Sequence, residues 1–194
     1  TEQLLALARE DAGTAGAGFV RLDLSALAAG AAETMRPLAE AGGVRLADGS
    51  CEPVLVRGDE ARLRQVFYAL LENAIRHTPP GGEVEVRVEA AGRRAVATVR
   101  DTGEGIAAEH LPRVFERFFR VDKARSRERG GTGLGLSIAQ GVVAAHGGEM
   151  ELESAPGLGT TARVLLPRWQ GSSDGEAAGR HASQARPAGS GRRT

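Results

Sequence analysis

The sequence predicts an α/β protein, a two-layer sandwich in which helices cover one face of a mixed, mostly antiparallel β-sheet. In some segments the apolar residues recur every three or four positions, as they do on the buried side of a helix. In others they alternate with polar residues, as they do on a strand. Because the helical segments alternate with hairpins rather than with single strands, a mixed sheet with helices on one face is favoured.

The composition is ordinary for a globular protein and excludes several classes. The 194 residues include 41% hydrophobic and 26% charged residues, enough for one well-buried core. The formal net charge is zero, so we expect no nucleic-acid partner. A single cysteine, Cys51, excludes an internal disulfide, and there is no Cys/His cluster typical of a structural metal site. With no run of about 20 apolar residues and no signal peptide, a cytoplasmic location is expected.

The first half of the chain contains two segments with helical periodicity. Residues 22–41 form one, although Pro37 falls inside it, and residues 59–77 form the other, with Asp59 as a candidate N-cap. Residues 44–46 and 53–56 are expected to be short strands. The predicted buried side of the second helix consists of Leu63, Val66, Phe67, Leu70, Leu71 and Ala74.

The second half begins with a hairpin and ends with another pair of strands. Between the pairs lie a looser segment with one short helix and then a longer helix that Gly147 and Gly148 end. The predicted elements are strands 84–88 and 95–99, a short helix near 111–119, a helix at 136–146, and strands 149–153 and 161–166.

The two ends of the chain differ from the middle. Residues 1–11 carry a short helical stripe with no N-cap, as at the end of a longer helix. The C-terminal residues are mainly Gly, Ser, Ala and Arg, which cannot bury enough apolar surface to offset the entropy of ordering. We therefore expect a helix end and linker at 1–18, one domain at 19–168 and a disordered tail at 169–194.

Three local features indicate a nucleotide site. The first is the segment Asp-Thr-Gly-Glu-Gly-Ile at 101–106, directly after a strand. An ionised Asp101 can accept the amino hydrogen of adenine, and Gly103 and Gly105 allow the backbone to approach a flat base. An ordinary Asp-Thr-Gly turn explains the same segment equally well.

The second feature is a glycine-rich run at 130–137 that leads into a helix. Glycines before a helix N-terminus present backbone N–H groups to an anion such as phosphate. The run lacks the Gly-Lys-Ser/Thr ending of a P-loop and follows a loop, which argues against a dinucleotide-binding βαβ unit. A flexible linker is the alternative.

The third feature is a polar face on the long helix. Asn73, Arg76 and His77 are three and four positions apart and so share one face. An amide oxygen, a guanidinium and an imidazole suit a polyphosphate with bound Mg²⁺. The alternative is a face that is simply solvated. Glu72 points about 100° away around the helix, and a surface charge explains it as well as a catalytic role does.

The order of these motifs resembles the catalytic and ATP-binding domain of sensor histidine kinases, within the superfamily of gyrase, Hsp90 and MutL ATPases. The resemblance covers about residues 22–167 and implies the Bergerat ATP-binding fold. The matching segments are 71–79 (N box), 101–106 (G1 box), 115–120 (F box, which points to histidine kinases), 131–136 (G2 box) and the last strand at 157–167.

The resemblance implies ATP and Mg²⁺ as cofactors, with roles for individual residues. Asn73 would bind the Mg²⁺, and Asp101 would recognise adenine with Thr160 helping through ordered water. Residues 104–131 would form the ATP lid. Asn73 and Glu72 are the candidate catalytic residues. The candidate cofactor-binding residues are Asn73, Arg76, His77, Asp101, Gly103, Gly105, Ile106, Thr132, Gly133, Leu134, Gly135 and Thr160.

Two departures from the family qualify this prediction. Ala69 replaces a polar residue, either an Asn or the general-base Glu of gyrase-type hydrolases, so a hydrolase is disfavoured and the affinity for Mg-ATP is expected to be reduced. None of the four histidines lies in the context of a phosphate-accepting site. We therefore expect the partners to be a histidine-bearing dimerisation domain outside this chain, whose last turns the stripe at 1–11 resembles, and a response regulator, within a homodimeric parent. A degenerate interaction module and an anti-sigma-type serine kinase are the alternatives.

Overall fold

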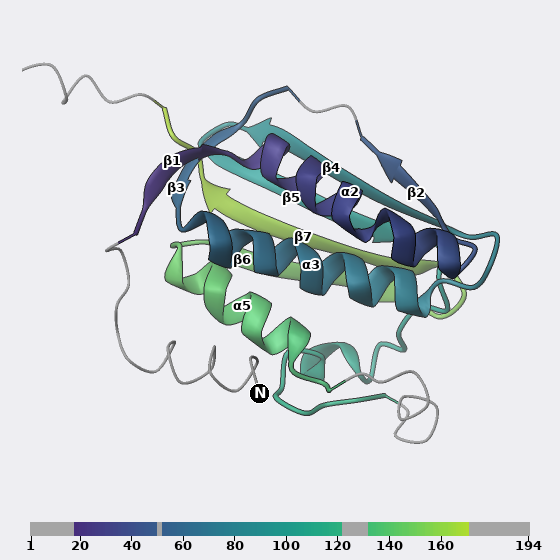
Figure 1. Ribbon diagram of the computed structural model, residues 1–194. Coiled ribbons are helices and arrows are strands. Elements are labelled where there is room, and N and C mark those ends of the chain that lie inside the picture. Colours follow the sequence, from purple (N-terminus) through teal and green to yellow (C-terminus); the bar gives the residue numbers. More distant parts are fainter. Residues whose placement is uncertain (1–17, 50–51, 122–131, 171–194) are drawn as a thin grey trace, which may run out of the picture.

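The computed structural model describes residues 18–49, 52–121 and 132–170. In this part of the chain three helices lie side by side on one face of a five-stranded sheet (Figure 1). They are α2 (Leu24–Ala41), α3 (Glu60–His77) and α5 (Gly135–Ala145). The predicted two-layer α/β sandwich is confirmed. No helix in the described ranges is long and apolar enough to cross a membrane.

The main sheet is mixed and mostly antiparallel, as predicted. Its strand order is β2-β4-β5-β7-β6, and only the pairing of β2 with β4 is parallel. The C-terminal end of β5 and the start of β7 are neighbours in the middle of the sheet, which brings the segment after β5 next to residues 159 and 160. The strands are β2 (Arg45–Asp48), β4 (Glu83–Ala91), β5 (Arg94–Asp101), β6 (Glu149–Ala155) and β7 (Gly159–Pro167).

Two further strands form a separate ribbon; the sequence did not predict the first of them, and the second, between α2 and α3, corresponds to the strand expected at 53–56. The ribbon pairs β1 (Val20–Asp23) with β3 (Leu55–Gly58) in antiparallel fashion. The helix expected from residue 22 therefore begins at Leu24. Asp23 has extended backbone angles, and its Oδ1 accepts hydrogen bonds from the N–H groups of Ser25 (2.9 Å) and Val54 (3.2 Å). The aspartate thus caps the helix and ties it to the residue before β3.

The helix expected near residues 111–119 was largely wrong. Only a single 3₁₀ turn forms, at Leu111–Arg113. Phe118 has a φ of +63°, outside the right-handed helical region, and its N–H donates to the carbonyl of Gly133 at 2.9 Å. This contact with the glycine-rich segment replaces helical hydrogen bonds. The predicted strands at 44–46 and 53–56 exist but begin one and two residues later.

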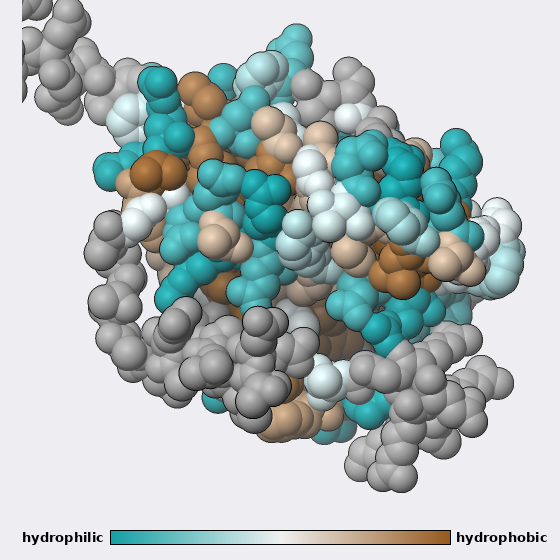
Figure 2. Space-filling view, viewed as in Figure 1, coloured by the Kyte–Doolittle hydropathy of each residue, from teal (hydrophilic) through white to brown (hydrophobic). Residues whose placement is uncertain are grey.

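The core lies between the helices and the inner face of the sheet. The predicted apolar side of α3 is buried, and Phe67 is 2% exposed. The valines of β4 that alternate inward, Val84, Val86 and Val88, are also buried. The helix-covered side is largely hydrophilic at its surface, with small apolar areas (Figure 2).

Near the C-terminus the described chain continues past β7. The N–H of Trp169 donates to the carbonyl of Leu55 at 2.7 Å, and the guanidinium of Arg57 lies 6.0 Å from the centre of the indole. Trp169 is therefore attached to β3. Of the helix end and linker predicted at 1–18 and the tail predicted at 169–194, all but residues 18, 169 and 170 lie outside the described residues.

Candidate functional site

The ends of α3 and α5 that carry the polar and glycine-rich motifs lie together. α3 begins at its N-cap Asp59, whose Oδ1 accepts the N–H of Arg62 at 3.1 Å. A Cβ added to Gly135, the first residue of α5, would lie 3.8 Å from the Cβ of Ala69. The small residue that departs from the family pattern therefore packs against the start of α5, one turn before Asn73.

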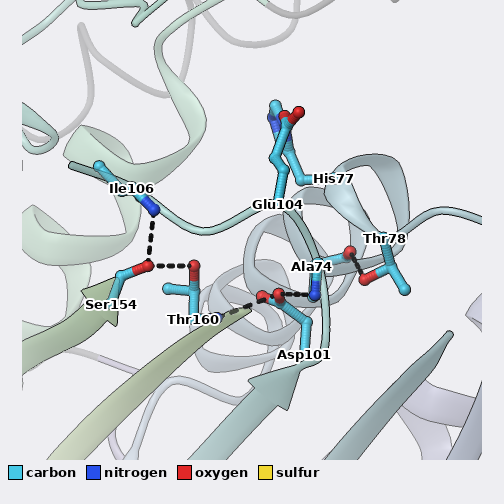
Figure 3. A network of polar contacts seen from close by, with 9 residues as sticks. Ala74, His77, Thr78, Asp101, Glu104, Ile106, Ser154 and Thr160 are labelled. Carbon is cyan, nitrogen blue, oxygen red and sulfur yellow. Dashed lines mark hydrogen bonds and ion pairs between the residues drawn. The ribbon is translucent and has the colours of Figure 1, made fainter. Parts of the chain in front are cut away.

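Asp101 is a buried carboxylate at the C-terminal end of β5. It is 6% exposed, and its Oδ1 accepts the N–H groups of Gly103 (2.8 Å) and Thr160 (3.1 Å), as Figure 3 shows in part. Its Oδ2 has no hydrogen-bond partner among the described residues. Burial raises the pKa of Asp101, although the two backbone donors oppose this shift. A buried carboxylate with an unused oxygen is suited to accept hydrogen bonds from a ligand.

A serine that sequence analysis missed connects the segment after Asp101 to Thr160. The Oγ of Ser154, on β6, lies 2.8 Å from the backbone N of Ile106, 2.8 Å from the carbonyl of Gly159 and 2.9 Å from the Oγ1 of Thr160 (Figure 3). Nothing in the sequence signals this role, because a serine in an alternating strand is unremarkable.

The loop after β5 is held from two sides. The N–H of Glu104 donates to the carbonyl of His77 at 3.2 Å, and its carbonyl accepts the N–H of Gly157 at 2.8 Å. The Nδ1 of His77 also lies 2.8 Å from the Oε1 of Glu104. Gly105 has a φ of +69°, and a Cβ there would lie 1.9 Å from the carbonyl oxygen of Ala155. Only glycine fits this position.

The glycine-rich segment is described from Thr132 onward and leads directly into α5, as predicted. Leu134, the residue before the helix, is buried, and its carbonyl accepts the hydroxyl of Ser137 at 2.9 Å. Gly133 has a φ of +70°. The first N–H groups of α5 are thus at the end of a turn whose shape depends on glycine.

The polar face of α3 contains one side chain with no partner and one ion pair. Asn73 is half-buried and forms no side-chain hydrogen bond with the described residues. The guanidinium of Arg76 pairs with the carboxylate of Glu72. No group of three or more His, Cys, Asp or Glu side chains in the described part of the chain is arranged to hold a metal ion. A cation here would therefore need oxygen ligands from phosphate and water in addition to Asn73.

Arg120 is a second residue that the list of candidate site residues omitted. Its Nε and one terminal nitrogen are buried, with no hydrogen-bond partner among the described residues. The preceding residue, Phe119, is close to the glycine-rich turn, because its carbonyl oxygen would lie 2.9 Å from a Cβ on Gly133. Buried guanidinium nitrogens without an acceptor are costly, and a bound anion is one group that can supply the acceptor. The signal was present in the sequence, since Arg120 ends the F box.

Comparison with known proteins agrees with this geometry. Residues 58–170, more than half of the chain, match the family model described as histidine kinase-, DNA gyrase B- and HSP90-like ATPase. The chain belongs to this ATPase family. Members of the family bind ATP, and the matched residues include all of the candidate site.

The similar curated proteins are sensor kinases. The sensor histidine kinase YkoH of Bacillus subtilis is 37% identical over 171 residues, which are 88% of this chain and 37% of that protein. The phosphate regulon sensor protein PhoR of Pseudomonas aeruginosa is 43% identical over 117 residues, 60% of this chain and 26% of that protein. The chain thus spans well under half the length of these relatives.

Solved structures show the same fold. The mycobacterial sensor histidine kinase MprB has a TM-score of 0.68 at 30% identity, covering 77% of this chain and 97% of that chain. Full-length ShkA, in complex with AMPPNP, has a TM-score of 0.74 at 30% identity, covering 86% of this chain and 35% of that chain.

Two of the segments that carry predicted site residues contact α3, and two residues are added to the candidate site. The segment at 101–106 contacts the end of α3 and the start of β7, and the start of α5 packs against α3. The additions are Ser154 and Arg120. Their roles toward a ligand, like those of the predicted residues, are proposals.

Proposed function

We propose that this chain is the ATP-binding catalytic domain of a two-component sensor histidine kinase. It would transfer the γ-phosphoryl group of ATP to a histidine in a separate dimerisation domain of a homodimeric parent, and that histidine would pass the phosphate to a response regulator. The observation that carries the proposal is the buried carboxylate of Asp101, whose Oδ2 has no partner among the residues that the structure describes. Its position in a family fold shared with sensor histidine kinases supports the proposal.

Different residues of the site would bind different parts of the nucleotide. Asp101 would accept the amino hydrogen of adenine, and the segment at 103–106 would form the wall beside the base. The N–H groups of residues 132–135, before and at the start of α5, would hold the phosphates. Arg76, at the end of α3 beside His77, would add positive charge next to them, and so would Arg120, two of whose nitrogens are buried without a partner in the described part of the chain.

Asn73 fits the role of a Mg²⁺ ligand because its amide has no partner among the described residues. When bound, the ion would neutralise charge on the phosphate oxygens. The protein's own contribution is position and charge: phosphoryl transfer needs little covalent chemistry from the enzyme. Glu72 is engaged by Arg76, which favours the role of a surface charge over that of a base.

Two of the three described histidines, His146 and His77, are held by contacts within the fold, and none of the three lies in the sequence context of a phosphate-accepting site, which supports an acceptor outside this chain. Both ring nitrogens of His146 are used, by the N–H of Asp59 and the carbonyl of Val142. The ring of His77 faces Glu104. Phosphoryl transfer to either would break these contacts. The reaction would take place in the cytoplasm, where ATP is available.

Calorimetric titration with ADP and a non-hydrolysable ATP analogue, with and without Mg²⁺, tests the binding step. We expect micromolar affinity that increases with the metal. Mixing the chain with ATP and a helical hairpin that bears the acceptor histidine tests transfer, and acid-labile phosphate on the hairpin is expected. The absence of any binding would contradict the proposal. Binding without transfer would favour the degenerate module, and acid-stable phosphate would favour the serine kinase.

A further inference from the structure

The hydroxyl of Ser154 uses its complete hydrogen-bonding capacity. A serine hydroxyl has one proton to donate and two lone pairs that accept. Three groups surround the Ser154 Oγ: the N–H of Ile106 (2.8 Å), the carbonyl of Gly159 (2.8 Å) and the hydroxyl of Thr160 (2.9 Å). The direction of each bond can therefore be assigned by elimination.

Two of the three groups have no choice of role. The backbone N–H of Ile106 can only donate, and the carbonyl of Gly159 can only accept. The single proton of Ser154 goes to Gly159, so its remaining lone pair takes the proton of Thr160. The reverse arrangement would deprive the carbonyl of Gly159, a buried residue, of this donor. The Thr160 hydroxyl thus directs its proton to Ser154 and presents only lone pairs elsewhere.

Thr160 is adjacent to the other acceptor of the site. Its backbone N–H donates to the Oδ1 of Asp101 at 3.1 Å, and the Oδ2 of Asp101 has no described partner. An ionised carboxylate is an acceptor only. A ligand that reaches this wall therefore meets two side-chain acceptors, Asp101 and Thr160, and neither offers a proton.

We propose that Ser154 determines the base specificity of the site by fixing the Thr160 hydroxyl as an acceptor. This inference rests on the proposed ATP-binding function and names the feature of the base that is read. A 6-amino purine has two amino hydrogens to offer to two acceptors, directly or through water. A 6-oxo purine places its own acceptor oxygen against the acceptors of Asp101 and Thr160, so these groups would have no proton to accept. Ser154 is a positioning residue, because it acts through Thr160.

The test compares ADP with inosine diphosphate, which carries a 6-oxo group, on the full chain by calorimetry. Wild type is expected to bind ADP more tightly. In Ser154→Ala the Thr160 proton is released and can turn to the 6-oxo group, so the ratio of the two Kd values falls by about tenfold, the size of one hydrogen bond. Loss of the Ile106 contact would weaken both nucleotides alike and leave the ratio unchanged.

If Ser154→Ala does not fold, the variant Thr160→Val still tests the inference. Thr160→Val removes the proton and the lone pairs together, so the ratio falls through weaker ADP binding, with no gain for inosine diphosphate. Thr161→Val is the matched control, because successive residues of a strand face opposite sides of the sheet. An unchanged ratio in a folded Ser154→Ala or Thr160→Val variant overturns this inference alone. If wild type binds neither nucleotide, the proposed function itself fails, and this inference with it.

Discussion

His146 and Asp59 are 87 positions apart in the sequence, and the Nε2 of the histidine accepts the backbone N–H of the aspartate at 3.0 Å. The Nδ1 of the same ring bonds to the carbonyl of Val142 at 2.7 Å, and Phe19 stacks on the ring with a centroid separation of 4.5 Å. Because Nε2 accepts, the ring is neutral, with its proton on Nδ1. One imidazole thus joins the end of α5, the N-cap of α3 and the segment before β1.

The neutral state of His146 predicts a pH-dependent stability. Burial lowers its pKa below the ordinary value of about 6.5; the facing carboxylate of Asp59 opposes this shift and Arg62 adds to it. The unfolded chain then binds more protons than the folded one, so stability is complete above about pH 6.5 and is lost as the pH falls. We expect the melting temperature to decrease from pH 7.5 to 5.5.

A glutamine variant isolates this effect. His146→Gln should be less stable by about 1–3 kcal/mol, because one amide cannot replace both ring contacts. It should also show a flatter dependence of melting temperature on pH. His110→Gln, just before the 3₁₀ turn, is the control and should keep the wild-type slope. An equal slope in His146→Gln would mean that other groups cause the pH dependence.

Substitutions of Asp101 are expected to affect the stability of the fold and the affinity for ADP differently. The raised pKa of Asp101 means that the charged form is penalised by burial, a cost that grows as the pH rises above the ordinary carboxyl value. Asp101→Asn keeps an oxygen for the N–H groups of Gly103 and Thr160 but removes the charge. Its melting temperature at pH 7 should equal or exceed that of wild type, while ADP affinity decreases by at least about tenfold.

Asp101→Ala supplies the comparison for that variant. It removes the charge and the acceptor together, so two buried N–H groups lose their partner and stability should decrease by about 1–3 kcal/mol. Thermal denaturation and ADP titration of both variants give the answer. Wild-type affinity in Asp101→Asn would contradict the assigned role of the carboxylate.

Gly105 and Gly157 form a matched pair for a backbone test. Both have positive φ values, +69° and +75°, but only at Gly105 would a Cβ collide, 1.9 Å from the carbonyl oxygen of Ala155. Gly157→Ala should cost about 1–2 kcal/mol of stability from backbone strain alone. Gly105→Ala should cost clearly more and weaken ADP binding. Equal losses by chemical denaturation would show that the close approach is not required.

Replacing Ala69 by Asn is expected to increase nucleotide affinity in the presence of Mg²⁺. Asn at this position would add a second amide oxygen one turn before Asn73, against the start of α5. We expect Ala69→Asn to increase affinity for the ATP analogue about three- to tenfold with Mg²⁺, and not without it. Ala61→Asn, exposed two turns earlier on α3, should change neither value. An equal gain without metal would point to a direct contact with the nucleotide instead.

Most helices and strands were predictable because their signals are local. α3 has a capping aspartate and a continuous apolar side, and the structure shows both as predicted. β1 was missed because a four-residue strand has little pattern of its own and Leu22 also fits the helical spacing that follows. The lid helix was overpredicted because Phe118 bonds to Gly133, a long-range contact that no local pattern reveals.

The residues of the candidate site that belong to sequence motifs could be predicted, and the others could not. The segment after Asp101 and the start of α5 both contact α3, because the fold packs a strand end and a helix end against this helix. The role of Ser154 depends on the pairing of β6 with β7, which puts it opposite Thr160, and that register is a property of the folded sheet. Arg120 ends the F box, but the burial of two of its nitrogens is a property of the folded chain that its sequence position does not reveal.

The double attachment of Glu104, to the carbonyl of His77 and to the N–H of Gly157, has a kinetic consequence. The backbone of the wall beside Asp101 loses its conformational freedom when the chain folds, before any ligand arrives. A ligand that docks there meets a rigid surface, and little further ordering is needed at that wall. Association at this wall should therefore be fast, and differences in residence time between ligands should arise from the contacts that hold them.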